Sequence, residues 1–434
     1  MSNSNEAATN ATPSLLEATK IWFKIGLLSF GGPAAQIALM HKMLVDERKW
    51  LSENQFLSAL SFCMLLPGPE AMQLATFSGW RLHGVLGGLI AGLLFVLPGA
   101  VVIFALAALY VTYGNLPFID TLFLGVQAVA VVIVIEALVK VSKRALKEPS
   151  HWFIAGLSFI ALFLFSVPFP IIILAAAIYG GLWGAHKTKD NTLAPKVSAS
   201  LTQTLKTLLI GLCIWVLPIL AIDSIFEGAI LTQIAIFFSK LALVTFGGAY
   251  AVLAYMAQSA VEDFGWLSAA QMLDGLGLAE TTPGPLILVT QFVGFLAAFG
   301  EGGYALAFAG GLTTLWVTFV PCFIFIFMGA PYLEWVSAQP RLEGALRAIT
   351  ASVVGVILNL SLWFALHVVF QEVIKTQFGA LKLWVPQLST FNSLAIGLIA
   401  LSFVLLIVRH MAIGWVLLIC ALCACAACYL GFVT

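Results

Sequence analysis

Charged residues are scarce in this chain. Of its 434 residues only 9% are charged and 61% are hydrophobic, and 20 basic residues are balanced by 20 acidic ones. A soluble domain carries about 25% charged residues, and a folded core of this length cannot hide so much apolar surface from water. The missing charge excludes a soluble globular enzyme and a disordered chain. The missing basic surplus excludes a nucleic-acid binder.

Catalytic and metal-binding motifs are missing as well. The chain has no H-E-x-x-H motif, no Walker loop and no clustered histidines. Four of the seven cysteines, Cys420, Cys423, Cys425 and Cys428, crowd the last apolar run, but on a helix they would spread around the circumference with no histidine beside them. We interpret them as small apolar packing residues. We therefore predict no enzyme activity, no metal and no cofactor, and any transport must be driven by a gradient.

What the chain does contain is a long series of apolar runs. Most approach the roughly 20 apolar residues that a helix needs to cross a bilayer core, whereas the ten-residue alternating segments of a β-barrel are missing. The polar N-terminus lacks the pattern of a signal peptide, so we expect insertion by the chain's own helices. The sequence predicts an all-α polytopic membrane protein. We divide it into a polar tail (1–16), a first transmembrane repeat (17–186), a cytoplasmic linker (187–206), an extra connecting helix (207–225) and a second transmembrane repeat (226–434).

The two halves are related in sequence. A shift of 216 residues places Phe30-Gly31-Gly32 on Phe246-Gly247-Gly248, and Pro67-Gly68-Pro69 on Pro283-Gly284-Pro285. Between residues 24 and 69, 18 of 46 aligned residues are identical. Hydrophobic bias could match leucine to leucine, but not these motifs in one register. The chain therefore contains an internal repeat.

Opposed charge in matching loops predicts that the repeats are inverted. Loops of the first half are basic, which places them in the cytoplasm: 41–53, 81–83, 140–151 and 186–206. The counterparts of the first two hold Glu262, Asp263 and Glu301 but no Lys or Arg, which places them outside. If 41–53 and 81–83 share a side, the Pro-Gly-Pro segment enters and leaves the membrane by one face. Each half would then hold two re-entrant hairpins; short or kinked full spans are the alternative.

Broken helices at matching positions of inverted halves predict a transporter substrate site. Irregular backbone at membrane depth is tolerated only where it packs in protein or lines a wet cavity, and the free N–H groups at a helix start suit an anion. The alternative is that these residues only kink tightly packed helices. The predicted backbone contacts to the substrate are Gly31, Gly32, Pro67, Gly68, Pro69, Gly247, Gly248, Pro283, Gly284 and Pro285.

Three cations lie in or beside the broken segments. Lys24 and Lys240 precede the two Phe-Gly-Gly motifs, and Arg81 closes the first Pro-Gly-Pro segment. A charge inside the bilayer is costly and usually functional. We therefore predict that all three contact the substrate. Snorkelling of the lysines to the membrane interface is the alternative.

Carboxylates adjoin both Pro-Gly-Pro motifs. Glu70 follows the first and Glu280 precedes the second. Intramembrane carboxylates beside an anion site can exchange protons, so we predict that these two couple transport to protons. Glu136, in a later apolar run, we assign to packing.

The motifs resemble those of the chromate transporter family, of the two-domain (long-chain) type. The resemblance rests on Phe30–Pro33, Pro67–Glu70, Phe246–Leu253 and Thr282–Pro285, and it covers nearly the whole chain. It implies a multi-pass protein of the bacterial inner membrane that exports chromate, gives chromate resistance and is driven by the proton-motive force. Sulfate is the natural look-alike of the substrate.

The expected function is secondary active export of a tetrahedral oxyanion, most simply chromate. An importer of sulfate or another oxyanion is the alternative within transport, and an anion channel or a non-transporting membrane sensor is the alternative from another class. The expected partners are the oxyanion, protons and the lipid bilayer, without nucleic acid; the pattern is compatible with a homodimer.

Overall fold

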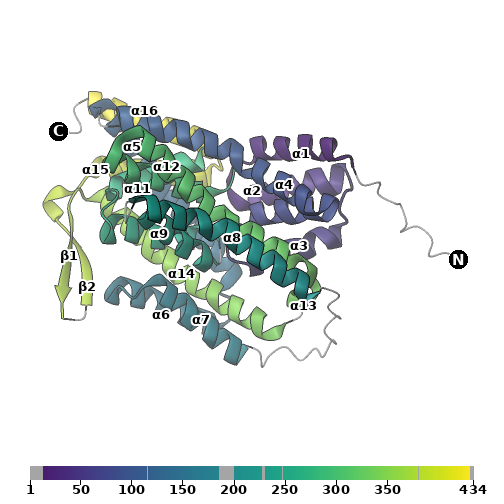
Figure 1. The fold of residues 1–434 in the computed structure, drawn as a ribbon. Coiled ribbons are helices and arrows are strands. Elements are labelled where there is room, and N and C mark those ends of the chain that lie inside the picture. The colour runs from purple at the N-terminus through teal and green to yellow at the C-terminus, as the bar shows by residue number, and fades with distance from the viewer. Residues whose placement is uncertain are drawn as a thin grey trace.

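Helices make up nearly all of the computed structural model (Figure 1). It describes residues 13–114, 116–184, 200–226, 230–246, 248–337, 339–379 and 381–430. Within these residues, five helices are long and apolar enough to cross a membrane: Glu70–Tyr113, Phe118–Ala145, Leu201–Ser224, Leu286–Tyr332 and Pro340–Val369. The chain is a multi-pass membrane protein.

The first half begins with short helices and continues with long ones. It comprises α1 (Leu15–Leu28), α2 (Gly32–His41), the π-helix η1 (Lys42–Glu47), α3 (Glu53–Leu65), α4 (Glu70–Tyr113), α5 (Pro117–Ala145), α6 (Pro149–Phe165) and α7 (Phe169–Trp183). The breaks between the short helices fall at the predicted motifs. Gly31 caps α2 at φ 85°, a left-handed conformation that glycine adopts without strain. Between α3 and α4, Pro67 cannot continue a helix.

The second half repeats this order. It comprises α9 (Ile230–Val244), α10 (Ala249–Gln258), η3 (Ser259–Asp263), α11 (Ala269–Glu280), η4 (Leu286–Leu288), α12 (Val289–Gly329), η5 (Ala330–Tyr332), α13 (Leu333–Ser337), α14 (Pro340–Val369), β1 (Val373–Phe378), β2 (Leu381–Pro386), η6 (Leu388–Thr390), α15 (Ser393–Phe403), η7 (Val404–Val408) and α16 (Ile413–Tyr429). The antiparallel hairpin of β1 and β2, with Val373 opposite Pro386, was not expected in an all-α protein.

A long helix, α8 (Leu201–Phe226), connects the halves. It begins within the segment predicted as a linker, and residues 187–199 of that linker lie outside the described residues.

The internal repeat predicted from the sequence is confirmed. A shift of 216 residues superimposes α1 on α9, α2 on α10 and α3 on α11 to within one or two residues at each end. Both α3 and α11 begin with the same capping box, formed by Ser52 with Gln55 and by Ser268 with Gln271. The long helices α4 and α12 each kink at a glycine with positive φ, Gly84 in one and Gly303 in the other.

The broken segments of the first half are re-entrant. Arg48, just after η1, pairs with Glu17 in the first turn of α1 at 3.0 Å. His83, at the kink of α4, donates a hydrogen bond to the carbonyl of Pro13 at 2.8 Å. The start of α1, the turn after α2 and the kink of α4 therefore lie at one end of the molecule. Both hairpins thus start and finish at that end, which favours re-entrant segments over kinked full spans.

The equivalent turns of the second half lie at the opposite end. Lys375 of the β-hairpin pairs with Glu262 of η3 at 2.6 Å, and Tyr304, just after the kink of α12, meets Thr112 near the end of α4. Figure 1 shows the β-hairpin at one end of the molecule and the start of α1 at the other. The two repeats are thus inverted, as the charge pattern predicted.

The halves also exchange their last two helices. Helices α6 and α7 of the first half pack on α14 of the second, and α15 and α16 pack on α5. Small residues allow these helices to approach closely. A Cβ atom on Gly180 would lie 2.3 Å from the carbonyl oxygen of Gly344, and one on Gly125 would lie 2.5 Å from that of Cys420. This exchange makes the two repeats one interlocked body.

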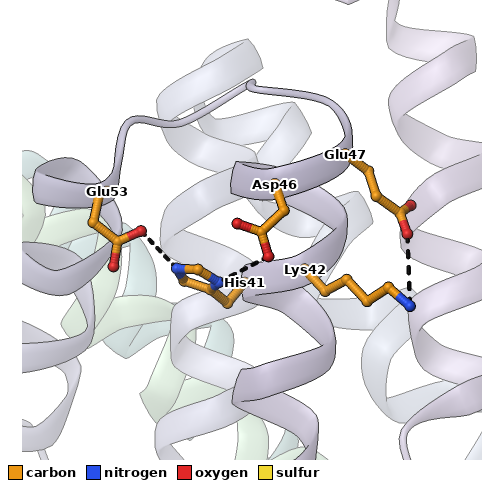
Figure 2. Close-up of polar contacts among 5 residues, drawn as sticks. All are labelled: His41, Lys42, Asp46, Glu47 and Glu53. Atoms are coloured by element: carbon orange, nitrogen blue, oxygen red, sulfur yellow. Dashed lines mark hydrogen bonds and ion pairs between the residues drawn. The ribbon is translucent and has the colours of Figure 1, made fainter.

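A charged cluster closes the turn at the end of α2. His41 lies between Glu53 at 2.7 Å and Asp46 at 3.5 Å, and Lys42 faces Glu47 at 3.9 Å (Figure 2). The hydrogen bond to Glu53 raises the pKa of His41, and the Asp46 carboxylate adds to this. The contribution of protonated His41 to the stability of this turn is therefore fully present below the ordinary pKa of histidine. It is lost as pH rises through the raised pKa.

The inverted arrangement predicts the sidedness of exposed residues. We expect single cysteines at Glu47 and Lys143, in a cysteine-free background, to react with an impermeant thiol reagent only from the cytoplasm. A cysteine at Asp263 should react only from outside, because η3 lies at the opposite end. All three side chains are exposed. Labelling of positions 47 and 263 from the same side would contradict the inverted repeat.

Candidate functional site

A cavity of about 620 Å³ lies where the two halves meet. The first half contributes Phe30 and Gly31 from the break between α1 and α2, and Glu136 and Lys140 from α5. The second half contributes Glu280 and Thr281 from the end of α11, Leu406 of η7 and the loop His410–Gly414. Polar groups of several kinds thus converge on a concave space, which is typical of a small-ligand site.

The N-terminus of α2 opens on this cavity. Gly31 is its N-cap residue, Pro33 follows in the first turn, and no side chain caps the helix. The first N–H groups of a helix have no partner within it and carry partial positive charge. Gly31 is therefore placed where the sequence predicted it, beside a space that an anion could occupy.

The Pro-Gly-Pro segments instead form hydrogen bonds between the two repeats. The N–H of Gly68 donates to the carbonyl of Thr245, and the N–H of Gly284 donates to that of Ser29, both at 2.8 Å. These two bonds are related by the repeat. Gln36 adds a further bond to the carbonyl of Gly284 at 2.6 Å. The glycine amides predicted to bind the substrate are thus already paired.

None of the six Pro-Gly-Pro residues lines the cavity: Pro67, Gly68, Pro69, Pro283, Gly284 and Pro285. Neither Gly32 nor Gly248 lines it either, and Gly247 lies outside the described residues.

Glu280 is the buried carboxylate of this site. It is the last residue of α11, it is only 7% exposed, and it accepts a hydrogen bond from the hydroxyl of Tyr250 at 2.8 Å. Thr281 follows it and is exposed to the cavity. The other predicted proton carrier, Glu70, begins α4 outside this cavity, where Arg144 acts on it electrostatically.

The cation of the site is Lys140, which the sequence analysis placed in a cytoplasmic loop. Helix α5 continues to Ala145, so Lys140 lies within the helix, one turn after Glu136, and the two side chains form an ion pair at 2.5 Å. Glu136, assigned to packing, is therefore a cavity residue. The i, i+4 spacing of the two charges was the signal that could have identified them.

The three predicted cations are not brought to the cavity. Lys24, Arg81 and Lys240 are exposed, and none lines the space. The two lysines lie on the faces of α1 and α9 opposite the buried residues of those helices. Helix rotation turns both lysines outward, which favours the snorkelling alternative, and their contact with the substrate stays a prediction.

Inverted repeats with broken helices around a shared polar cavity define a membrane transporter. The sequence profile of the chromate transporter family matches residues 16–181 and 232–427, one copy in each half. The chain belongs to the chromate transporter family, whose members are transporters and not enzymes.

Curated proteins similar to this chain support its place in the family. The chain is 30% identical to a probable chromate transport protein of Synechococcus elongatus over 344 residues, which cover 79% of this chain and 83% of that protein. It is 33% identical to a chromate transport protein of Pseudomonas aeruginosa over 366 residues (82% and 83%). It is 27% identical to one of Cupriavidus metallidurans over 355 residues (80% and 82%). No solved structure matches.

Proposed function

We propose that this protein exports chromate from the cytoplasm across the cytoplasmic membrane, driven by the proton-motive force. The observation that carries the proposal is the cavity shared by the halves, with a cation, a buried carboxylate and a helix N-terminus on its wall. Relatives named chromate transport proteins support the choice of ion.

The cavity wall suits a tetrahedral dianion. Lys140 supplies a positive charge, the Thr281 hydroxyl can donate a hydrogen bond, and Gly31 lines the cavity at the positive end of α2. Charge-assisted hydrogen bonds of this kind are the strong ones. When the anion binds, Lys140 exchanges its contact with Glu136 for a contact with the substrate. Sulfate has the same shape and charge, so it is expected to compete.

Glu280 is the proposed proton carrier of the site. A charged carboxylate beside a bound dianion would repel it, whereas a protonated one would not. Proton and anion therefore favour each other, and this coupling is reciprocal. Glu70 is the second candidate, because it begins the helix that follows the first Pro-Gly-Pro segment.

The charge balance then sets the driving force. A dianion that leaves with one proton carries one net negative charge outward. At equal pH on the two sides, an inside-negative membrane potential of 100 mV favours that step by about 2.3 kcal/mol, which corresponds to a roughly 50-fold concentration ratio. The electrical part of the proton-motive force is thus sufficient to drive export.

Inside-out membrane vesicles test this function. We expect vesicles containing the protein to accumulate radiolabelled chromate when the lumen is made positive by a potassium gradient and valinomycin, and excess sulfate to reduce the uptake. Vesicles without the protein are the control. Chromate flux that follows its own gradient with no response to bath pH would indicate a channel. Accumulation only with the potential reversed would indicate an importer.

A further inference from the structure

Helix α11 carries a second buried carboxylate that the cavity does not use. Asp274 is 4% exposed. It accepts hydrogen bonds from the Tyr110 hydroxyl of α4 at 2.7 Å and from the Gln127 amide of α5 at 2.9 Å. Glu280, at the inner end of the same helix, likewise accepts from a tyrosine hydroxyl. Both carboxylates of α11 are therefore buried and held by a tyrosine.

Neither carboxylate has a cation partner. Among the described residues, no lysine, arginine or histidine forms an ion pair with Asp274 or Glu280. Lys140 lines the same cavity as Glu280, but it pairs with Glu136. Phe292 of α12 packs beside Gly275, the residue after Asp274, and is apolar. An unpaired charge buried in such surroundings is costly, and ionisable residues kept there at this cost are usually functional.

The first repeat has no counterpart of these groups. The 216-residue shift places Ser58 at the position of Asp274, Met64 at that of Glu280 and Ala34 at that of Tyr250. None of these side chains gains or loses a proton near neutral pH. The fold needs no carboxylate at either position of this hairpin, since the first repeat forms the same helix without one. We therefore attribute Asp274 and Glu280 to the function of the second repeat and not to its folding.

The position of Asp274 places it on the outer side of the site. Helix α11 starts beside η3, at the end of the molecule that the charge pattern places outside, and ends at the cavity. Six residues separate Asp274 from Glu280, about 9 Å along the helix axis. Tyr110 lies in the last turn of α4, at this outer end, and its hydroxyl donates to Asp274.

We propose that Asp274 is a second proton-binding group of the transport cycle, which exchanges its proton with the outer solution while Glu280 serves the cavity. The inference rests on the proposed function. The proton passes between the outer solution and the Asp274 carboxyl by way of the Tyr110 hydroxyl, which donates to that carboxyl. When Asp274 loses its proton, the buried charge favours release of α11 from α4 and α5, on the outer side of the cavity.

Inside-out vesicles separate the two groups, because their lumen corresponds to the outer solution. Chromate uptake is measured with lumen pH and bath pH varied independently. A single titrating group changes a rate by at most about tenfold per pH unit. In the native protein we expect the rate to respond to both sides. In Asp274→Asn we expect less than a twofold response to lumen pH and a retained response to bath pH.

Two further variants complete the test. Asp263→Asn removes an exposed carboxylate at the same end and should keep the native response to lumen pH. Tyr110→Phe keeps Asp274 but removes the hydroxyl that connects it to the outer solution, so its response to lumen pH should also fall below twofold. A native lumen response in both Asp274→Asn and Tyr110→Phe would overturn the inference. Failure of the native protein to accumulate chromate would instead overturn the proposed function.

Discussion

Replacement of Lys140 by alanine is expected to lower the affinity for chromate about tenfold. A hydrogen bond to a charged group contributes about 1.5–3 kcal/mol, and the Lys140 side chain is 69% exposed, which favours the lower limit. The change also leaves Glu136 facing the cavity without its partner, which adds repulsion of the anion. The measurement is the KM for chromate uptake into inside-out vesicles at equal protein levels.

Matched controls isolate the role of the cavity. Lys240→Ala removes an exposed cation from α9, far from the cavity wall, and should leave the KM within twofold of native. Lys140→Arg keeps the charge and should retain much of the affinity, although its fork geometry differs. A native KM for Lys140→Ala, or an equal loss in Lys240→Ala, would refute the assignment of Lys140.

The repeat made most of the fold predictable. Motifs such as Trp-Leu-Ser and Pro-Gly-Pro recur in one register, and the segment 41–53 holds three Lys or Arg residues whereas 257–268 holds none. Together these facts determined two inverted halves with re-entrant hairpins. The β-hairpin of Val373–Pro386 could not be found in this way, because it has no counterpart in the first half and its role is to hold Glu262 through Lys375.

The site was less predictable, because the residues that line the cavity are not at equivalent positions of the two repeats. Its wall combines the break of one half with the loop His410–Gly414, which reaches it only because α15 and α16 pack on the other half's α5. Symmetry suggested Lys24 together with Lys240. The side chain that reaches the cavity is Lys140, and the shift that aligns Pro98 with Pro321 places Trp363 opposite it. Local sequence fixes which residues break a helix, but helix rotation decides which charges face inward.

Replacement of Glu280 by glutamine is expected to make the affinity for chromate independent of pH. Glutamine has the shape of the protonated acid, and its carbonyl can still accept the hydrogen bond from Tyr250. In the native protein, low pH should tighten chromate binding, because protonation removes a negative charge beside the dianion. In Glu280→Gln, affinity should stay at its acidic value as the pH rises, a gain of up to about tenfold per pH unit relative to native. Equilibrium binding of chromate to purified protein across pH measures this.

The same variant should alter the electrical driving force. Without a proton on Glu280, each chromate leaves with its full double charge, so the dependence of uptake on membrane potential should steepen towards about 4.6 kcal/mol per 100 mV. Glu70→Gln is the matched control, since Glu70 begins a helix outside the cavity. Native pH dependence in Glu280→Gln combined with its loss in Glu70→Gln would move the proton to Glu70. Native pH dependence in both variants would show that neither Glu280 nor Glu70 carries the proton. The pH dependence of chromate binding would then not come from a carboxylate beside either Pro-Gly-Pro segment.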